Sequence, residues 1–170
     1  MSMRSKVREA PRDALFDALA DTRTGMLAVE GSGQLLQPMT HHADRATGEI
    51  WFITSIETDL VRAVGLGGRA QYCLASKAQD LHASMSGTLE QVDDPEKLDS
   101  LWSPFASAWF AEGREDPKII LLRLTLLDAE LWASSESAVV MGIEMVRAAI
   151  SPSHSPDLAD HSVIRFTDPV

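Results

Sequence analysis

Three hydroxyl-bearing residues, Thr54, Ser55 and Thr58, form the most suggestive chemical pattern in this sequence. Thr54 and Ser55 end a strand-like run, and Thr58 stands where a short helix is expected to begin. Hydroxyls and unpaired backbone N–H groups at such a junction can bind a phosphate, because the start of a helix carries the positive end of its dipole. Capping of the helix by Thr58 explains the same residues more simply, so both interpretations stay open.

Other residues with reactive side chains occur in patterns that predict no further chemistry. His41 and His42 are adjacent, and neighbouring residues of a strand point to opposite faces, so one ion cannot easily bind both imidazoles. Cys73 lies in an apolar run with no neighbour that favours a thiolate. The glycine-rich residues 65–68 follow a helix pattern and precede a strand, which is typical of a helix stop rather than a dinucleotide loop. We therefore predict no metal site and no catalytic side chain.

The stretch from Leu101 to Trp132 contains three of the four tryptophans, Trp102, Trp109 and Trp132. Tryptophan rings bury a large area and can also stack on a planar ligand. Their position before and at the end of one long apolar strand predicts a ligand platform as well as a core.

Composition limits the classes of function. The chain has 170 residues and a net charge of −10, with no block of basic residues, which argues against a nucleic-acid-binding face. No apolar run approaches the ~18 residues of a membrane span, and the N-terminus lacks the apolar core of a signal peptide. A single cysteine together with the missing signal is typical of a cytoplasmic protein.

Hydrophobic periodicity predicts a chain rich in antiparallel strands. Pro38 lies inside one strand and places it at an edge or bulge of the sheet, and Gly87 in another predicts a bulge. The expected strands are residues 24–30, 34–41, 49–55, 69–76, 81–92, a strand from 118 and a last one at 163–166. The expected helices start at Pro11, Thr58 and Asp94, with a last one at 139–150 before a polar loop at 151–161. This order favours an α+β barrel over a Rossmann fold.

Taken together, the segments resemble the general stress protein 26 family of pyridoxamine 5′-phosphate oxidase-like proteins. Each segment alone is weak, but their order along residues 20–135 is fairly specific. The residues that carry the resemblance are Gly25-Met26-Leu27, Gln37-Pro38-Met39, Gly48-Glu49-Ile50-Trp51-Phe52-Ile53-Thr54-Ser55, Ser86-Gly87-Thr88, Leu101-Trp102, Ala108-Trp109-Phe110, Gly113, Asp116-Pro117, Leu121-Leu122-Arg123-Leu124 and Ala129-Glu130-Leu131-Trp132.

The resemblance implies an α+β fold with an antiparallel split β-barrel and peripheral helices. Residues 1–170 would form a single FMN-binding domain, with a C-terminal helix and tail from about residue 135. It further implies a homodimer that binds two FMN molecules in clefts between its subunits. The residues that would line the flavin, hold its phosphate or cover its ring are Leu36, Gln37, Pro38, Met39, Phe52, Ile53, Thr54, Ser55, Thr58, Leu60, Trp109 and Trp132.

Two positions depart from the family pattern. The family usually carries arginine just before Pro-Met, where this chain has Gln37, and lysine two residues after the helix-start hydroxyl, where it has Leu60. Those cations would form charge-assisted hydrogen bonds with the FMN phosphate. Arg62 and Arg69 are the candidates to replace them.

The leading hypothesis is therefore a cytoplasmic flavin-binding dimer of the FMN-dependent oxidoreductase type, in which the cofactor would do the redox chemistry. The alternative is a non-enzymatic split-barrel dimer that has lost FMN and serves as a binding or stress-related protein. A third hypothesis places another planar ligand, such as haem, in the same cleft.

Overall fold

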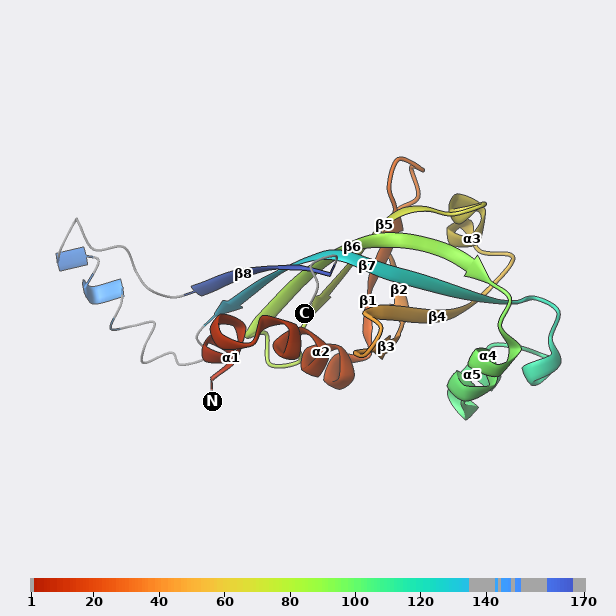
Figure 1. Cartoon of the computed structure of the whole chain (residues 1–170), viewed down its shortest axis with the longest axis horizontal. Coiled ribbons are helices and arrows are strands. Elements are labelled where there is room, and N and C mark those ends of the chain that lie inside the picture. Colours follow the sequence, from red (N-terminus) through yellow and green to blue (C-terminus); the bar gives the residue numbers. More distant parts are fainter. Residues whose placement is uncertain (1, 135–142, 144, 148, 151–158, 167–170) are drawn as a thin grey trace.

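The computed structural model describes residues 2–134, 143, 145–147, 149–150 and 159–166. Helices and strands alternate irregularly along these residues (Figure 1). The helices are α1 Met3–Glu9, α2 Pro11–Thr22, α3 Asp59–Val64, α4 Pro95–Leu101, α5 Pro104–Ser107 and the 3-10 turn η1 Gly113–Glu115. The strands are β1 Thr24–Val29, β2 Gln37–Thr40, β3 His42–Asp44, β4 Glu49–Ser55, β5 Gly68–Ala75, β6 Leu81–Val92, β7 Ile119–Ser134 and β8 Ala159–Arg165.

The strands form one antiparallel sheet in the order β2-β1-β5-β6-β7-β4-β3, and β8 also pairs with β7. Along one side β7 pairs with β6; along the other its first half pairs with β4 and its second half with β8. The sheet curls, so that β2 and β4, far apart in strand order, line the same cavity. This is the predicted α+β fold with an antiparallel split barrel.

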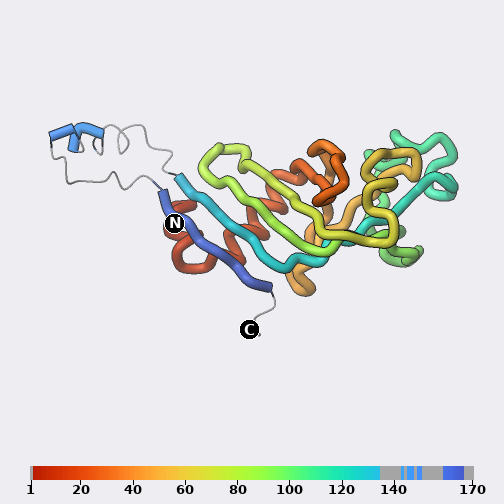
Figure 2. The backbone as a smooth tube through the Cα atoms, turned by 90° about the horizontal axis from the view of Figure 1, so that it is seen from above, coloured from red at the N-terminus to blue at the C-terminus, as the bar shows by residue number. Residues whose placement is uncertain are grey.

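The main core lies between the curled sheet and helices α1 to α3. Leu15 and Leu19 of α2 and Leu60 and Val64 of α3 are buried in it. Both views show α1 and α2 beside β7 and β8 (Figure 1 and Figure 2), where Arg4 and Arg8 form ion pairs with Asp160 of β8.

A second, smaller core holds α4 on β4 and β7. Its buried members are Trp51, Leu98 and Leu121, and the half-buried Trp102 packs against them. This cluster fixes the start of the segment that carries α5 and Trp109.

Several local predictions are confirmed. The strands at 49–55 and 81–92 have the expected bounds. Pro38 lies in the edge strand β2, and the register of β6 against β7 shifts between Ser86 and Gly87. A Cβ atom on Gly87 would lie 2.3 Å from the carbonyl oxygen of Thr125, so the bulge requires glycine.

Other boundaries differ from the prediction. The second strand begins at Gln37 rather than at residue 34, because Gln34 instead accepts a hydrogen bond from Val29 N–H with its side chain. Helix α1 was not predicted, and β8 begins at Ala159, inside the predicted 151–161 loop. Residues 151–158 of that loop lie outside the described residues, as do residues 139–142 of the predicted last helix; positions 143, 145–147, 149 and 150 are helical. Among the described residues, no helix has both the length and the apolar character needed to span a bilayer.

Candidate functional site

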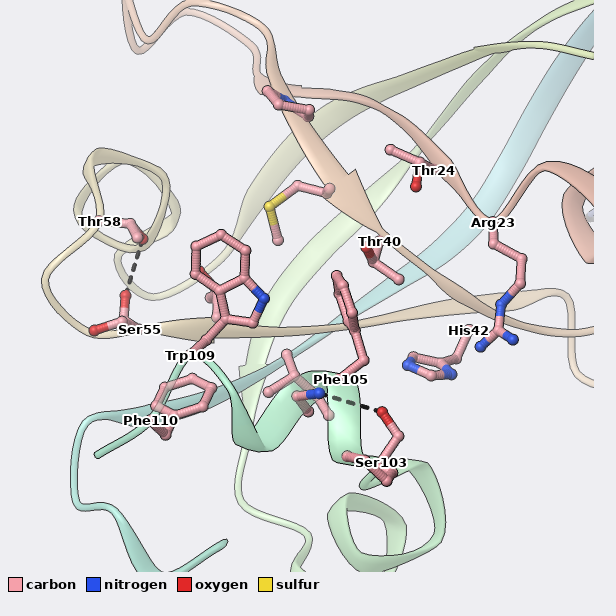
Figure 3. A pocket seen from close by; sticks show the side chains of 16 residues that line it. Arg23, Thr24, Thr40, His42, Ser55, Thr58, Ser103, Phe105, Trp109 and Phe110 are labelled. Carbon is pink, nitrogen blue, oxygen red and sulfur yellow. Dashed lines mark hydrogen bonds between the residues drawn. The ribbon is translucent and has the colours of Figure 1, made fainter. Parts of the chain in front are cut away.

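A cavity of about 670 Å³ opens between β2, β4 and the segment that contains α5 (Figure 3). Its volume falls within the ~300–1,000 Å³ typical of small-molecule sites. The residues that line it are Arg23, Thr24, Pro38, Met39, Thr40, His42, Ile53, Thr54, Ser55, Thr58, Ser103, Pro104, Phe105, Ala106, Trp109 and Phe110. Seven of the predicted site residues are among these sixteen: Pro38, Met39, Ile53, Thr54, Ser55, Thr58 and Trp109.

Two strands supply the apolar wall. Pro38 and Met39 belong to the edge strand β2, where a proline costs no ladder hydrogen bond on the open side. Ile53 and Thr54 lie near the end of β4 and pair with Leu121 and Ile120 of β7. The central strand β7 thereby fixes the position of the wall.

Thr58 acts as the N-cap of α3. Its hydroxyl donates to the Ser55 carbonyl at 2.9 Å and accepts the Val61 N–H at 3.3 Å. The Ser55 hydroxyl accepts the Glu57 N–H at 3.3 Å, which leaves its own proton available for a ligand. The capping interpretation thus describes Thr58, and Ser55 retains the donor that a phosphate could accept.

The cations near this end of the cavity are engaged with acidic residues. Arg62 forms an ion pair with Asp59 and donates to the Glu57 carbonyl. Lys118 lies 2.8 Å from Glu57, and this hydrogen bond raises the pKa of Lys118. Neither Arg62 nor Arg69 lines the cavity.

Arg23 and His42 lie at the other end of the cavity, where Figure 3 shows them side by side. Arg23 closes α2 in a left-handed conformation (φ 61°), and its carbonyl accepts the His41 N–H at 3.0 Å. Burial lowers the pKa of His42, and the positive charges of Arg23 and Lys97 lower it further. His42 is therefore a neutral imidazole near pH 7, beside a charged guanidinium. Sequence reasoning missed both residues for the site, because only the curl of the sheet brings the end of α2 to β3.

Aromatic side chains cover the cavity from α5 and the turn after it. Phe105 is 62% exposed and Trp109 is 74% exposed, with ring centroids 6.4 Å apart in an edge-to-face arrangement. Phe110 is buried against Trp102, 5.9 Å between centroids. Two large rings left open to solvent beside a cavity are suited to stacking on a planar ligand.

The remaining predicted residues lie elsewhere. Phe52 and Leu60 are fully buried in the main core, and Leu36 is exposed in the turn before β2. The half-buried Gln37 side chain donates to the Met39 sulfur at 3.4 Å. Trp132 stacks on His161 of β8 at 5.4 Å, at the end of the sheet away from α5 (Figure 1).

Comparison with protein families matches residues 10–157 to the family described as pyridoxamine 5′-phosphate oxidase like. The chain belongs to the pyridoxamine 5′-phosphate oxidase-like family. This confirms the resemblance drawn from the ordered motifs. The comparison with curated proteins found no match.

Solved structures similar to this family member include three general stress proteins. One from Jannaschia sp. CCS1, described as a general stress protein 26, is 35% identical, with 89% of this chain and 95% of that chain covered and a TM-score of 0.72. A general stress family protein from Xanthomonas campestris pv. campestris is 38% identical over 77% and 91% of the two chains (TM-score 0.69). The general stress FMN/FAD binding protein from Xanthomonas citri is 37% identical over 74% and 90% (TM-score 0.68).

Proposed function

We propose that this protein is a cytoplasmic, homodimeric flavoprotein that binds FMN in the cavity between β2, β4 and α5. The observation that carries the proposal is the cavity itself. Apolar strand residues form one wall, two exposed aromatic rings cover the other, and hydroxyl groups lie at one end. The 37% identical protein from Xanthomonas citri named as FMN/FAD binding supports it.

The residues present suit a flat, partly apolar group. Pro38, Met39 and Ile53 offer an apolar surface to a ring, and Phe105 and Trp109 can stack on its other side. When bound, a flavin would supply the one- and two-electron chemistry of an oxidoreductase. The protein's own residues would position the ring and exclude water from it.

Among the described residues, the Ser55 end would offer the phosphate of FMN hydroxyl partners but no free cation. Ser55 and Thr54 can donate hydrogen bonds, whereas Arg62 and Lys118 are already paired with acidic groups. We therefore expect FMN affinity to depend less on charge at this end than in relatives with arginine and lysine there.

Dimerisation would explain the aromatic exposure. Phe105 and Trp109 are both more than half exposed beside the cavity, and large apolar side chains gathered at one site usually mark a surface that another molecule covers. A second copy placed over α5 would also exclude solvent from the ligand. Sedimentation equilibrium across a range of protein concentrations tests this.

A visible spectrum of the purified protein tests flavin binding. We expect absorption bands near those of free FMN, removal of the flavin by acid or salt, and a rise in melting temperature when FMN is restored. Absence of a flavin band together with no FMN-dependent rise in melting temperature would remove the proposal.

The second candidate function is a split-barrel binding protein without flavin. The two positions that differ from the family pattern support it. Leu60 is a core residue, and Gln37 forms hydrogen bonds with its neighbours Gln34 and Met39. Tight FMN binding by the unaltered protein would exclude this candidate.

A further inference from the structure

We propose that Arg23, together with His42, forms a subsite for a carboxylate or phosphate group at the end of the cavity away from Ser55. The inference rests on the proposed function for the location of the ligand, but not on the ligand being a flavin. It assigns a binding role to two residues that lie outside the motifs shared with the family.

The charge of Arg23 is uncompensated. Among the described residues that line the cavity, it is the only lysine or arginine. Within the described part of the chain its guanidinium forms no ion pair and no hydrogen bond, although the protein carries 25 acidic and 15 basic residues. The nearby Lys97, in contrast, is paired with Asp44 at 3.5 Å. A guanidinium left unpaired in an acidic protein is available for an anionic ligand, which it can bind through two parallel hydrogen bonds.

Neighbouring groups add donors without adding charge. The neutral imidazole of His42 can donate one N–H. Thr24 and Thr40, opposite each other in the β1–β2 pair, contribute hydroxyls to the same wall. One guanidinium and several neutral donors would give a carboxylate or phosphate a charge-assisted hydrogen bond together with neutral ones.

Backbone geometry fixes the position of Arg23. The residue caps α2, its N–H donates to the Leu19 carbonyl at 3.2 Å and its carbonyl accepts from His41. The side chain therefore starts from a rigid point between a helix and a strand. A pre-positioned cation loses less entropy on binding than one on a loop.

The subsite is separate from the Ser55 end. His42 is the register partner of Trp51 on β4, and Ser55 lies four residues further along that strand. At a rise of about 3.3 Å per residue the two ends are roughly 13 Å apart. In Figure 3, Phe105 and Trp109 lie between the Ser55 end and the Arg23 end. The cavity thus has the length for a planar ring system with an anion at the Arg23 end.

Two sources could supply this anion: the phosphate of the flavin, or the acidic group of a second planar ligand. Two matched pairs of probes distinguish them: FMN with riboflavin, and 1-naphthoate with the neutral 1-naphthamide. Dissociation constants of all four are measured by tryptophan fluorescence on wild type and on Arg23→Gln, Arg23→Lys and Arg165→Gln. Arg165 is exposed on β8 and does not line the cavity, so its variant controls for the change in net charge.

We expect Arg23→Gln to weaken binding of the charged member of one pair about 10- to 100-fold, with the neutral member unchanged and partial recovery in Arg23→Lys. If Arg23→Gln loses affinity only for FMN, the anion bound at Arg23 is the flavin phosphate. If it loses affinity only for 1-naphthoate on the FMN-loaded protein, the anion belongs to a second ligand. If the protein binds no flavin, the proposed function fails, and the naphthoate pair on the unloaded protein still decides the subsite.

Three results would overturn the inference. The first is unchanged binding of both charged probes in Arg23→Gln. The second is an equal loss for charged and neutral probes, which would indicate a packing role. The third is a wild type that does not distinguish the charged from the neutral member of either pair.

Discussion

The phenol oxygen of Tyr72 lies 2.5 Å from Nδ1 of His41, and both side chains are buried. The Nε2–H of the same imidazole donates to the Leu19 carbonyl at 2.8 Å. The Tyr72 oxygen also lies 3.0 Å from the carbonyl oxygen of Met39, a residue of the cavity wall. One polar network therefore joins α2, β5 and β2 directly behind the proposed ligand site.

This network predicts a loss of stability in mild acid. Burial lowers the pKa of His41 from 6.5 to about 4, so between these values the unfolded chain binds a proton that the folded protein does not. The contribution of His41 to the free energy of unfolding is complete above pH 6.5. It is lost as the pH drops towards 4, by on the order of 3 kcal/mol in total. Urea unfolding at intervals between pH 7.5 and pH 4.5 measures the slope.

The variant His41→Gln should flatten that slope, and His82→Gln, at an exposed position of β6, should leave it unchanged. A residual slope in His41→Gln is expected, because the pKa of His42 is lowered in the same direction. A slope in His41→Gln as steep as that of the wild type would contradict the assignment.

Replacing Leu60 by lysine should destabilise the fold rather than create a phosphate site. Leu60 is fully buried in the main core, so Leu60→Lys loses apolar packing and requires an ammonium group to be desolvated, at a cost of about 2–5 kcal/mol. Gln37→Arg, at a half-buried position of the edge strand, should cost less than about 1 kcal/mol. Chemical denaturation of both variants checks the difference. Equal stability of Leu60→Lys and wild type would show that this side chain can turn out of the core.

The contrast between Leu60 and Thr58 shows how far the sequence alone could lead. Thr58 as a helix cap, Glu49–Ser55 as a strand and the bulge at Gly87 follow from local rules, because capping, alternation and glycine sterics act over a few residues. The ordered motifs then identified the family. The direction of the Leu60 side chain depended on how α3 packs on the sheet, which no local rule specifies.

The cavity also contains some residues that the sequence could predict and others that depend on tertiary packing. Pro38, Met39, Ile53, Thr54 and Ser55 come from two strands and were predicted together from the family pattern. Arg23 and His42 could not be predicted, because only the position of the end of α2 and the curl of the sheet place them at the cavity. Trp132 pairs with His161 of β8, in the half of β7 that does not pair with the cavity strand β4, and a tryptophan in the sequence carries no signal that separates a ligand cover from a strand-end stack.

Two glycines should differ sharply in their tolerance of a methyl group. A Cβ on Gly87 would meet the Thr125 carbonyl oxygen at 2.3 Å, whereas nothing lies within 4 Å of a Cβ on Gly33, whose φ is +75°. Gly87→Ala must therefore push β6 away from β7, and we expect a loss of about 3 kcal/mol or more. Gly33→Ala bears only the cost of the left-handed conformation, about 1–2 kcal/mol. Thermal unfolding of the two variants, monitored by circular dichroism, tests this order; a less stable Gly33→Ala would reverse the argument.

Trp109 should contribute to flavin binding more than to folding. Its ring is 74% exposed and lines the cavity, whereas the 41% exposed Trp132 stacks on His161 at the other end of the sheet. Stacking of a planar ring on an aromatic side chain contributes about 0.5–1.5 kcal/mol, so Trp109→Ala should raise the dissociation constant for FMN roughly three- to tenfold with little change in melting temperature. Trp132→Ala removes an equal ring and is the matched control, with a smaller expected effect. Titration of each variant with FMN, followed by flavin fluorescence, gives both constants. If Trp132→Ala weakens FMN binding more than Trp109→Ala does, the ring cover comes from the β7 end of a second copy, and α5 only borders the cavity.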